Sequence, residues 1–200
     1  MGVTLTTAQQ AAEKQILDAA AAAGLSAADA GYLIKVAYIE SSLNPNASRS
    51  DGGTASGLFG YTDGTWAQSN SDLGSKSSST NQISAMIREV AKYTDYYNSP
   101  QTNGNIPASM SRQEYMYIKH HDGIGSTPSF NAPGAHIWSA SPFNPVVTTD
   151  VNGFISGGVE YDGIYDMVWD GATGYAYADI SYTGNVEAIM LYDGGAGSDT

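Results

Sequence analysis

The sequence predicts a mainly helical α+β protein, in which a helical domain over residues 1–144 precedes a short β-rich region over residues 145–200. Three observations predict this class. Alanine-rich stretches with helix-capping residues fill the first part of the chain. Near Pro142–Pro145 they give way to a Gly- and Tyr-rich pattern of short strands and turns. All eight Lys and Arg residues lie at or before Lys119, so the C-terminal part carries acidic residues without basic ones.

Composition excludes several classes of protein. With 200 residues and 42% hydrophobic residues, the chain is long and apolar enough to bury the core of one average domain. Its net charge of −12 argues against a nucleic-acid partner, which requires a basic face. The absence of cysteine excludes disulfides, thiolate metal sites and cysteine nucleophiles. No signal peptide and no membrane span are predicted.

Capping residues mark the first two helices. Thr6-x-x-Gln9 and Ser26-x-x-Asp29 both have the form of a capping box, in which the first side chain bonds the backbone of the third residue after it. Gly24 is expected to end the first helix, because glycine readily adopts the left-handed conformation found there.

The second helix is expected over residues 27–41 and carries a carboxylate on its apolar stripe. Asn44-Pro45 follows and prevents the helix from continuing. Spacings of i, i+3, i+4 and i+7 place four residues on one face: Leu33, Val36, Ala37 and Glu40. Glu40 therefore lies on, or at the edge of, the face that packs into the core.

Further elements follow from periodicity and turn residues. Helices are expected over residues 81–97 and from Ser111 to about His121. Residues 44–66 are rich in Gly, Ser, Asp and Thr, which favours turns and a short hairpin. In the tail, the pattern predicts short strands over residues 154–161, 165–169, 175–182 and 187–192.

Glu40 is the candidate catalytic acid. At the end of an apolar stripe its carboxyl group is partly removed from water, and it lies at the negative end of the helix dipole. Both effects disfavour the charged form, and cleavage of a glycosidic bond requires a protonated carboxylic acid. From spacing alone, a solvated helix-end glutamate is the favoured interpretation, and the residues that follow Glu40 reverse that preference.

The residues around Glu40 resemble two linked motifs of the SLT-type lytic transglycosylases, relatives of lysozyme that cleave peptidoglycan. Residues 40–47 read ESSLNPNA, similar to the family pattern E-S-x-x-N-P-x-A. Residues 54–62 read TASGLFGYT and precede Gly64-Thr65-Trp66, similar to G-x-x-G-L-[MFY]-Q-[FIY]-x-P-x-T-[WF]. The resemblance covers about residues 10–140. It implies a lysozyme-like helical domain with a small hairpin beside the active-site cleft.

A third segment, Lys119–Gly125, is similar to the family segments A-Y-N-A-G-P-G and A-H-F-L-G-P-G. An ordinary helix end is the alternative interpretation of its two histidines. The resemblance implies that Glu40 acts as general acid and then as general base. The implied substrate-binding residues are Ser56, Gly57, Phe59, Tyr61, His120 and His121. For Trp66 core packing is expected, and for Asn44 a bracing role in the turn after the helix.

The chain departs from the family pattern at two positions. Gly60 stands where the family has a Gln whose amide faces the sugar, which puts substrate preference and rate in doubt. Asp63 stands where the family has Pro, and we expect it to be the N-cap of a helix starting near Gly64.

The resemblance implies cleavage of the β-1,4 bond between N-acetylmuramic acid and N-acetylglucosamine, with a 1,6-anhydro product. A hydrolytic lysozyme is the first alternative, and it needs a second carboxylate, for which Asp51 and Asp63 are the candidates nearest in sequence. The second alternative is a non-catalytic protein that binds glycan or has a structural role in a virion. No cofactor is expected, and no metal site, because His120, His121 and His136 lack the spacing of a helical zinc site.

The combination of domains suggests a bacteriophage protein. We expect a virion component, a tail or ejected protein, acting on peptidoglycan in the host periplasm or cell wall, with a released endolysin as the alternative. Residues 145–200 are expected to serve attachment to other virion proteins, self-association or packing on the helical domain.

Overall fold

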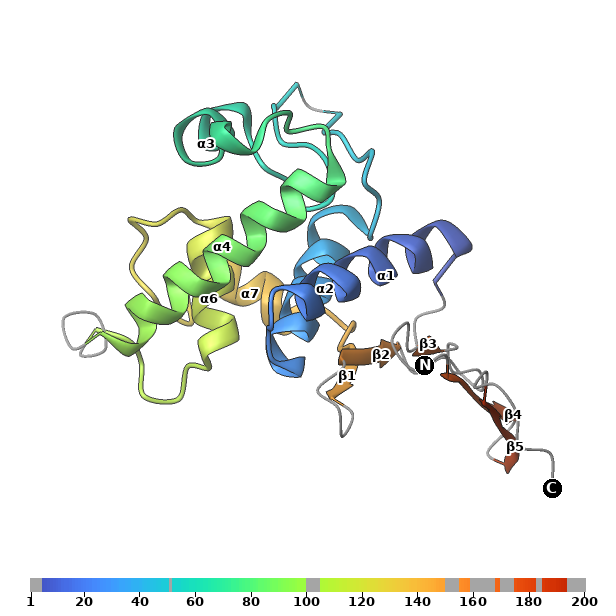
Figure 1. Cartoon of the computed structure of the whole chain (residues 1–200). Helices are drawn as coiled ribbons and strands as arrows, with labels where there is room; N and C mark the ends of the chain where they lie inside the picture. Colours follow the sequence, from blue (N-terminus) through green and yellow to red (C-terminus); the bar gives the residue numbers. More distant parts are fainter. Residues whose placement is uncertain are drawn as a thin grey trace.

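A computed structural model describes residues 5–50, 52–99, 105–149, 155–158, 168–169, 175–182 and 185–193. Helices predominate among these residues, as predicted (Figure 1). They are α1 (Thr7–Ala22), α2 (Ala27–Ser41), α3 (Asp63–Ser69), α4 (Ser79–Asn98), α6 (Arg112–His121) and α7 (Pro133–Ala140), with a short 3-10 helix, η1 (Ser71–Leu73). None of the described helices is both long and apolar enough to cross a membrane.

The predicted capping residues begin the helices. The Thr6 hydroxyl accepts from the Gln9 backbone, and the Gln9 side chain accepts from the Thr6 N–H at 2.7 Å, which completes a capping box. Ser26 likewise caps α2 by accepting from the Asp29 N–H. The Asp29 carboxylate accepts from the Ser26 hydroxyl and pairs with Arg112 of α6, so this cap also joins two helices.

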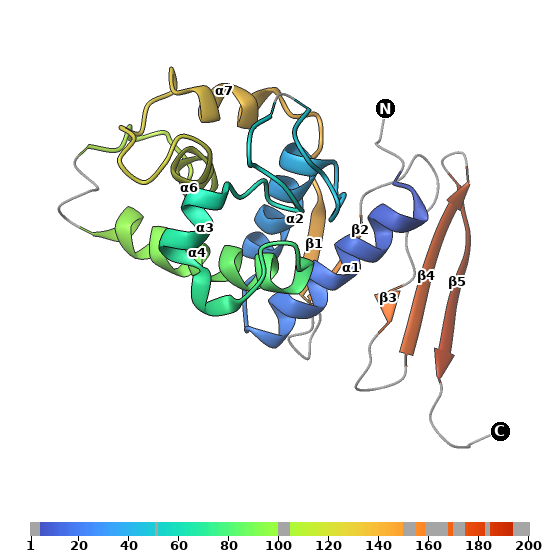
Figure 2. The same ribbon diagram turned by 90° about the horizontal axis from the view of Figure 1, so that it is seen from above.

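Helix α2 lies at the centre of the core. Leu33, Ile34, Val36 and Ala37 are fully buried, so the helix is covered on more than one face. It contacts α1, α4 and α6, and Figures 1 and 2 show it between α1 and α6. Because neighbours surround α2, its C-terminal end has a fixed position in the molecule.

Two short helices complete the body. The N-cap of α3 is Thr62, which accepts from the Thr65 N–H at 3.1 Å, so the prediction that Asp63 is the N-cap was wrong by one residue. Helix α7 was not predicted, and its own N-cap makes no side-chain hydrogen bond. The Asp122 carboxylate, at the end of α6, instead accepts from the Gly134 N–H in the first turn of α7.

The expected hairpin between α2 and α3 is reduced to two isolated bridges. Ser56 pairs antiparallel with Ser48 on one side and with Tyr61 on the other. Turn residues dominate this segment, so the chain folds back without forming extended strands.

The described strands are β1 (Val146–Thr149), β2 (Ile155–Gly158), β3 (Val168–Trp169), β4 (Tyr175–Tyr182) and β5 (Asn185–Asp193). β1 and β2 form one antiparallel pair, and β3, β4 and β5 form a three-stranded antiparallel sheet in that order. β1 contacts α2, and Val147 packs against the helical core. Residues just after position 144 therefore pack on the helical domain that precedes it.

Candidate active site

A cleft of about 800 Å³ opens where α2 ends. Its walls come from the loop before α3, from α3 and α4, and from the end of α6 with the loop that follows it. Four of the predicted site residues line this cleft: Glu40, Tyr61, His120 and His121. Residues about 80 positions apart in the chain thus meet in one hollow.

Glu40 is half-buried at the last turn of α2 and accepts a hydrogen bond from Tyr117 of α6. The distance from the Tyr117 hydroxyl to Glu40 Oε1 is 2.7 Å. Burial, together with the charge of Glu40 and this hydrogen bond, raises the pKa of Tyr117 far above its ordinary value. Tyr117 therefore keeps its proton at any physiological pH and acts as a fixed donor to Glu40.

The turn after Glu40 holds the end of α2 against the loop that precedes α3. The Ser41 hydroxyl contacts the carbonyl oxygens of Ala37 and Leu58, each at 2.8 Å. Ser42 and Leu43 both adopt left-handed backbone, with φ of 54° and 58°. Two consecutive non-glycine residues in that region are uncommon, and such strain is concentrated at functional sites. Asn44 supports the turn as predicted, by accepting from the Asn46 N–H at 2.9 Å.

Gly60 lies directly against the catalytic candidate. A Cβ at this position would stand 2.8 Å from Glu40 Oε2, closer than a real Cβ contact, and the φ of Gly60 is +65°. Gly60, at the position where the similar motif has Gln, therefore does more than remove an amide. Because glycine has no side chain, the Glu40 carboxyl group can occupy the space where a Cβ would otherwise stand.

Gly60→Ala is expected to abolish any activity that requires Glu40, because the new methyl group displaces the Glu40 carboxyl group. The left-handed backbone adds a cost of about 1–2 kcal/mol in the free energy of unfolding. Gly24→Ala is the matched control, since Gly24 has a φ of +67° with nothing within 4 Å of the added Cβ. Urea denaturation should show similar destabilisation of both variants, and only Gly60→Ala should lose activity. Equal activity in the two variants would contradict the role given to Gly60.

His120 connects two walls of the cleft. Its Nδ1 lies 2.9 Å from Glu89 Oε2 on α4, and its Nε2 lies 3.0 Å from the Phe59 carbonyl oxygen. Burial lowers the pKa of His120, but the charge and hydrogen bond of Glu89 and the charge of Glu40 outweigh burial and raise it to about 9. His120 is therefore an imidazolium at neutral pH, and it donates from both ring nitrogens.

Glu89 is the main functional candidate that sequence reasoning missed. Its side chain is only 14% exposed and lines the cleft, and after burial its charge is the next cause that raises the pKa of the buried Tyr61 hydroxyl. A signal was present in the sequence, because Ala85, Met86 and Tyr93 stand at i−4, i−3 and i+4 from Glu89 on one helix face. Tyr117 carried a similar signal, three residues before His120.

Three predicted binding residues lie behind the cleft wall. The Phe59 side chain is fully buried in the core, so the prediction that it contacts sugar was wrong, and only its carbonyl serves the site through His120. Gly57 is also buried, with a φ of +78°. Ser56 is half-buried and bridges Ser48 and Tyr61, and neither Ser56 nor Gly57 lines the cleft.

Gln82 of α4 holds this wall from behind. Its Oε1 accepts from the Phe59 N–H at 2.9 Å, and its Nε2 donates to the carbonyls of Ser56 at 3.1 Å and Lys76 at 2.7 Å. The residue is 1% exposed, so water does not compete for these bonds. An ideal Cβ on Gly57 would be 1.9 Å from Gln82 Nε2, which explains the glycine.

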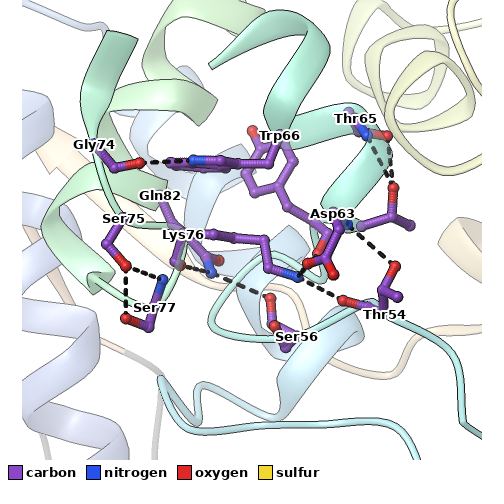
Figure 3. Close-up of polar contacts among 12 residues, drawn as sticks. Thr54, Ser56, Asp63, Thr65, Trp66, Gly74, Ser75, Lys76, Ser77 and Gln82 are labelled. Carbon is purple, nitrogen blue, oxygen red and sulfur yellow. Dashed lines mark hydrogen bonds and ion pairs between the residues drawn. The ribbon is translucent and has the colours of Figure 1, made fainter. Parts of the chain in front are cut away.

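Lys76 holds the same loop through backbone carbonyls and an ion pair (Figure 3). Its ammonium group donates to the carbonyls of Thr54 at 2.5 Å and Tyr61 at 3.0 Å, and pairs with Asp63 at 2.6 Å. The Trp66 ring lies beside it and donates to the Gly74 carbonyl at 2.9 Å, a core role that was predicted. The loop that carries Gly60 is thus held by Gln82 and by Lys76.

Gln82→Leu is expected to lower the free energy of unfolding by about 2–3 kcal/mol, because it leaves buried backbone groups without partners. Gln15→Leu is the control, since the Gln15 amide bonds the hydroxyls of Thr80 and Ser79 near the surface. Its effect should stay within about 0.5 kcal/mol. Urea denaturation of both variants checks this, and equal losses would refute the role assigned to Gln82.

The structure removes Asp63 as a second carboxylate. Its side chain is 70% exposed, pairs with Lys76 and does not line the cleft. Asp51 lies outside the described residues. The acidic side chains that do line the cleft are Glu40, Glu89 and Asp122, and Asp122 Oδ1 lies 2.6 Å from Nδ1 of the exposed His121.

Comparison of the chain with models of known protein families, with curated proteins and with solved structures gave no match. In the part of the chain that the structure describes, no three His, Asp or Glu side chains are grouped to hold a metal ion.

Proposed function

We propose that this chain is a lysozyme-like enzyme that cleaves the β-1,4 bond between N-acetylmuramic acid and N-acetylglucosamine in peptidoglycan. The observation that carries the proposal is the Glu40 carboxyl group, which lines the cleft and is oriented by a hydroxyl 2.7 Å away. The motif similarity around residues 40–47 and 54–66 supports the same substrate. Under this proposal residues 1–144 are the peptidoglycan-cleaving domain, and residues 145–200 are a β-rich attachment or association region.

Lytic transglycosylation fits the site with one acid. Glu40 donates its proton to the glycosidic oxygen as the C1–O bond breaks, while the N-acetyl oxygen of the same sugar supports the anomeric carbon. The Glu40 carboxylate then removes the proton of the 6-hydroxyl group, whose oxygen bonds to C1. The product is a 1,6-anhydro sugar, and no water is consumed.

A hydrolytic lysozyme is the second candidate, and Glu89 is the observation that favours it. A retaining hydrolase needs two carboxyl groups about 5–5.5 Å apart, and Glu89 is a second carboxylate in the same cleft. Its Oε2 is already bonded to the His120 imidazolium, which weakens it as a nucleophile and favours the one-acid mechanism.

Analysis of sugar ends tests the proposal and separates the two mechanisms. Purified peptidoglycan is digested, reduced with borohydride and analysed by mass spectrometry. We expect anhydromuramic acid ends, which borohydride leaves unchanged. Reducible muramic acid ends without anhydro sugar would establish hydrolysis, and a substrate without new ends would contradict cleavage altogether.

We also propose a location. A wall-cleaving domain joined to a β-rich region suits a phage virion protein that opens the host wall during entry. The net charge of −12 fits an endolysin less well, because a released enzyme gains from a basic surface that adsorbs to the wall. Mass spectrometry of purified virions tests this part, and absence of the chain from them would contradict it.

A further inference from the structure

Basic residues gather in the cleft of an otherwise acidic protein. The chain has eight Lys and Arg residues and a net charge of −12. Four of the eight line the cleft: Arg49, Arg88, Lys92 and Lys119. Three acidic side chains also line the cleft: Glu40, Glu89 and Asp122. Glu89 pairs with the His120 imidazolium, and Asp122 lies 2.6 Å from His121. The cleft is therefore much less negative than the rest of the surface.

Arg88 and Lys92 are two of these cations that a ligand in the cleft can reach. They are exposed, lie one turn apart on α4 and flank Glu89 along the cleft wall. Lys119 is buried and donates to the backbone carbonyls of Ile124 and Ser126, so it has a structural role.

The contacts of Arg88 and Lys92 are weak ones. Arg88 pairs with Asp72 at 2.8 Å, but the two side chains are 50% and 62% exposed. Exposed pairs of this kind contribute about 0–1 kcal/mol, so a ligand carboxylate can replace Asp72 at little cost. The Lys92 ammonium lies 5.8 Å from the centroid of the Tyr93 ring, which stabilises it little at an exposed site.

We propose that Arg88 and Lys92 form a carboxylate subsite that binds the acidic peptide stem of muramic acid. This inference rests on the proposed function and adds a substrate preference to it. A bare N-acetylglucosamine polymer is neutral, whereas peptide-substituted muramic acid carries carboxylates beside the bond to be cut. Arginine binds a carboxylate through two parallel hydrogen bonds, and a lysine one turn away reaches a second. The cleft therefore selects peptide-bearing glycan over a neutral one.

Binding to a Glu40→Gln background tests this without cleavage of the probe. Two probes are compared by calorimetry: a disaccharide-tripeptide muropeptide, which is anionic, and chitotetraose, which is neutral. Arg88→Gln combined with Lys92→Gln should weaken muropeptide binding about 10-fold or more, the effect of losing charge-assisted hydrogen bonds. Chitotetraose affinity should change by no more than about twofold, within the range of a surface substitution.

Matched variants complete the design. Lys14→Gln removes an exposed charge on α1 that pairs with Asp18 away from the cleft, and it should leave both affinities unchanged. Arg88→Lys keeps the positive charge at this position. When it is combined with Lys92→Gln, this variant should bind the muropeptide more tightly than the Arg88→Gln, Lys92→Gln double variant does. Equal losses for both probes, or no loss for the muropeptide, would overturn the subsite.

The outcomes for the subsite and for the proposed function are distinguishable. If the unmodified protein cleaves peptidoglycan while the double variant binds the muropeptide normally, the subsite alone is wrong. If Arg88 and Lys92 govern muropeptide binding but the unmodified protein releases no glycan, the subsite stands and the cleavage proposal fails.

Discussion

Glu40→Gln is expected to reduce peptidoglycan cleavage by a factor of about 10³, in the range found when a general acid is removed. The amide has nearly the shape of the carboxyl group, and its oxygen can still accept the 2.7 Å hydrogen bond from Tyr117. It has no acidic proton to give to the leaving oxygen. The loss should therefore appear in kcat with little change in KM.

The fold of this variant should remain intact, because Glu40 is half-buried at a helix end and outside the central packing of α2. Circular dichroism melting should give a midpoint close to that of the unmodified protein. Glu114→Gln is the control, since Glu114 lies in the first turn of α6 and does not line the cleft. Retained cleavage by Glu40→Gln, or equal loss in the control, would show that the acid is wrongly assigned.

The second large effect is a loss of stability at alkaline pH that depends on Glu89. The pKa of His120 is raised from 6.5 to about 9 by folding. A raised histidine pKa stabilises the folded state in full below pH 6.5, and this stabilisation is lost as the pH rises through about 9. From the size of the shift, the free energy of unfolding should fall by about 3 kcal/mol over that interval.

Glu89→Gln should remove most of this pH dependence, because the charge that raises the pKa of His120 is gone and burial then lowers it. His136→Gln is the control, since His136 is exposed on α7 and bears on neither Glu89 nor His120. Urea denaturation at pH 6.5 and pH 9.5 measures the difference. An alkaline loss that is the same in Glu89→Gln and in the unmodified protein would contradict the His120–Glu89 ion pair.

Local signals in the sequence were sufficient for the helices and for Glu40. The expected helix over residues 27–41 coincides with α2, because Ser26 caps it and the residues after Ser41 cannot continue it. The helix from Ser111 to about His121 likewise matches α6. Capping and periodicity involve residues within a few positions of each other, so a sequence displays them directly.

The rest of the site depends on contacts between distant segments. Periodicity places Glu89 on a buried face of α4 but does not show that His120, 31 positions later, supplies its partner. Phe59 lies inside a motif typical of a cleft, yet its side chain is buried in the core. The Phe59 N–H donates to the buried Gln82 side chain, which holds the backbone of this loop against α4. The first turn of α7 is capped by Asp122, which lies at the end of α6. The residues of α7 themselves therefore do not show where this helix begins.

Mass spectrometry of the soluble fragments that the purified protein releases from peptidoglycan sacculi decides whether Glu40 is a glycan-cleaving acid. We expect disaccharide-peptide fragments cut between N-acetylmuramic acid and N-acetylglucosamine. The Glu40→Gln protein should release none above background. Fragments cut only in the peptides, or none from the unmodified protein, would contradict the assignment of Glu40 as the acid that cleaves the glycan.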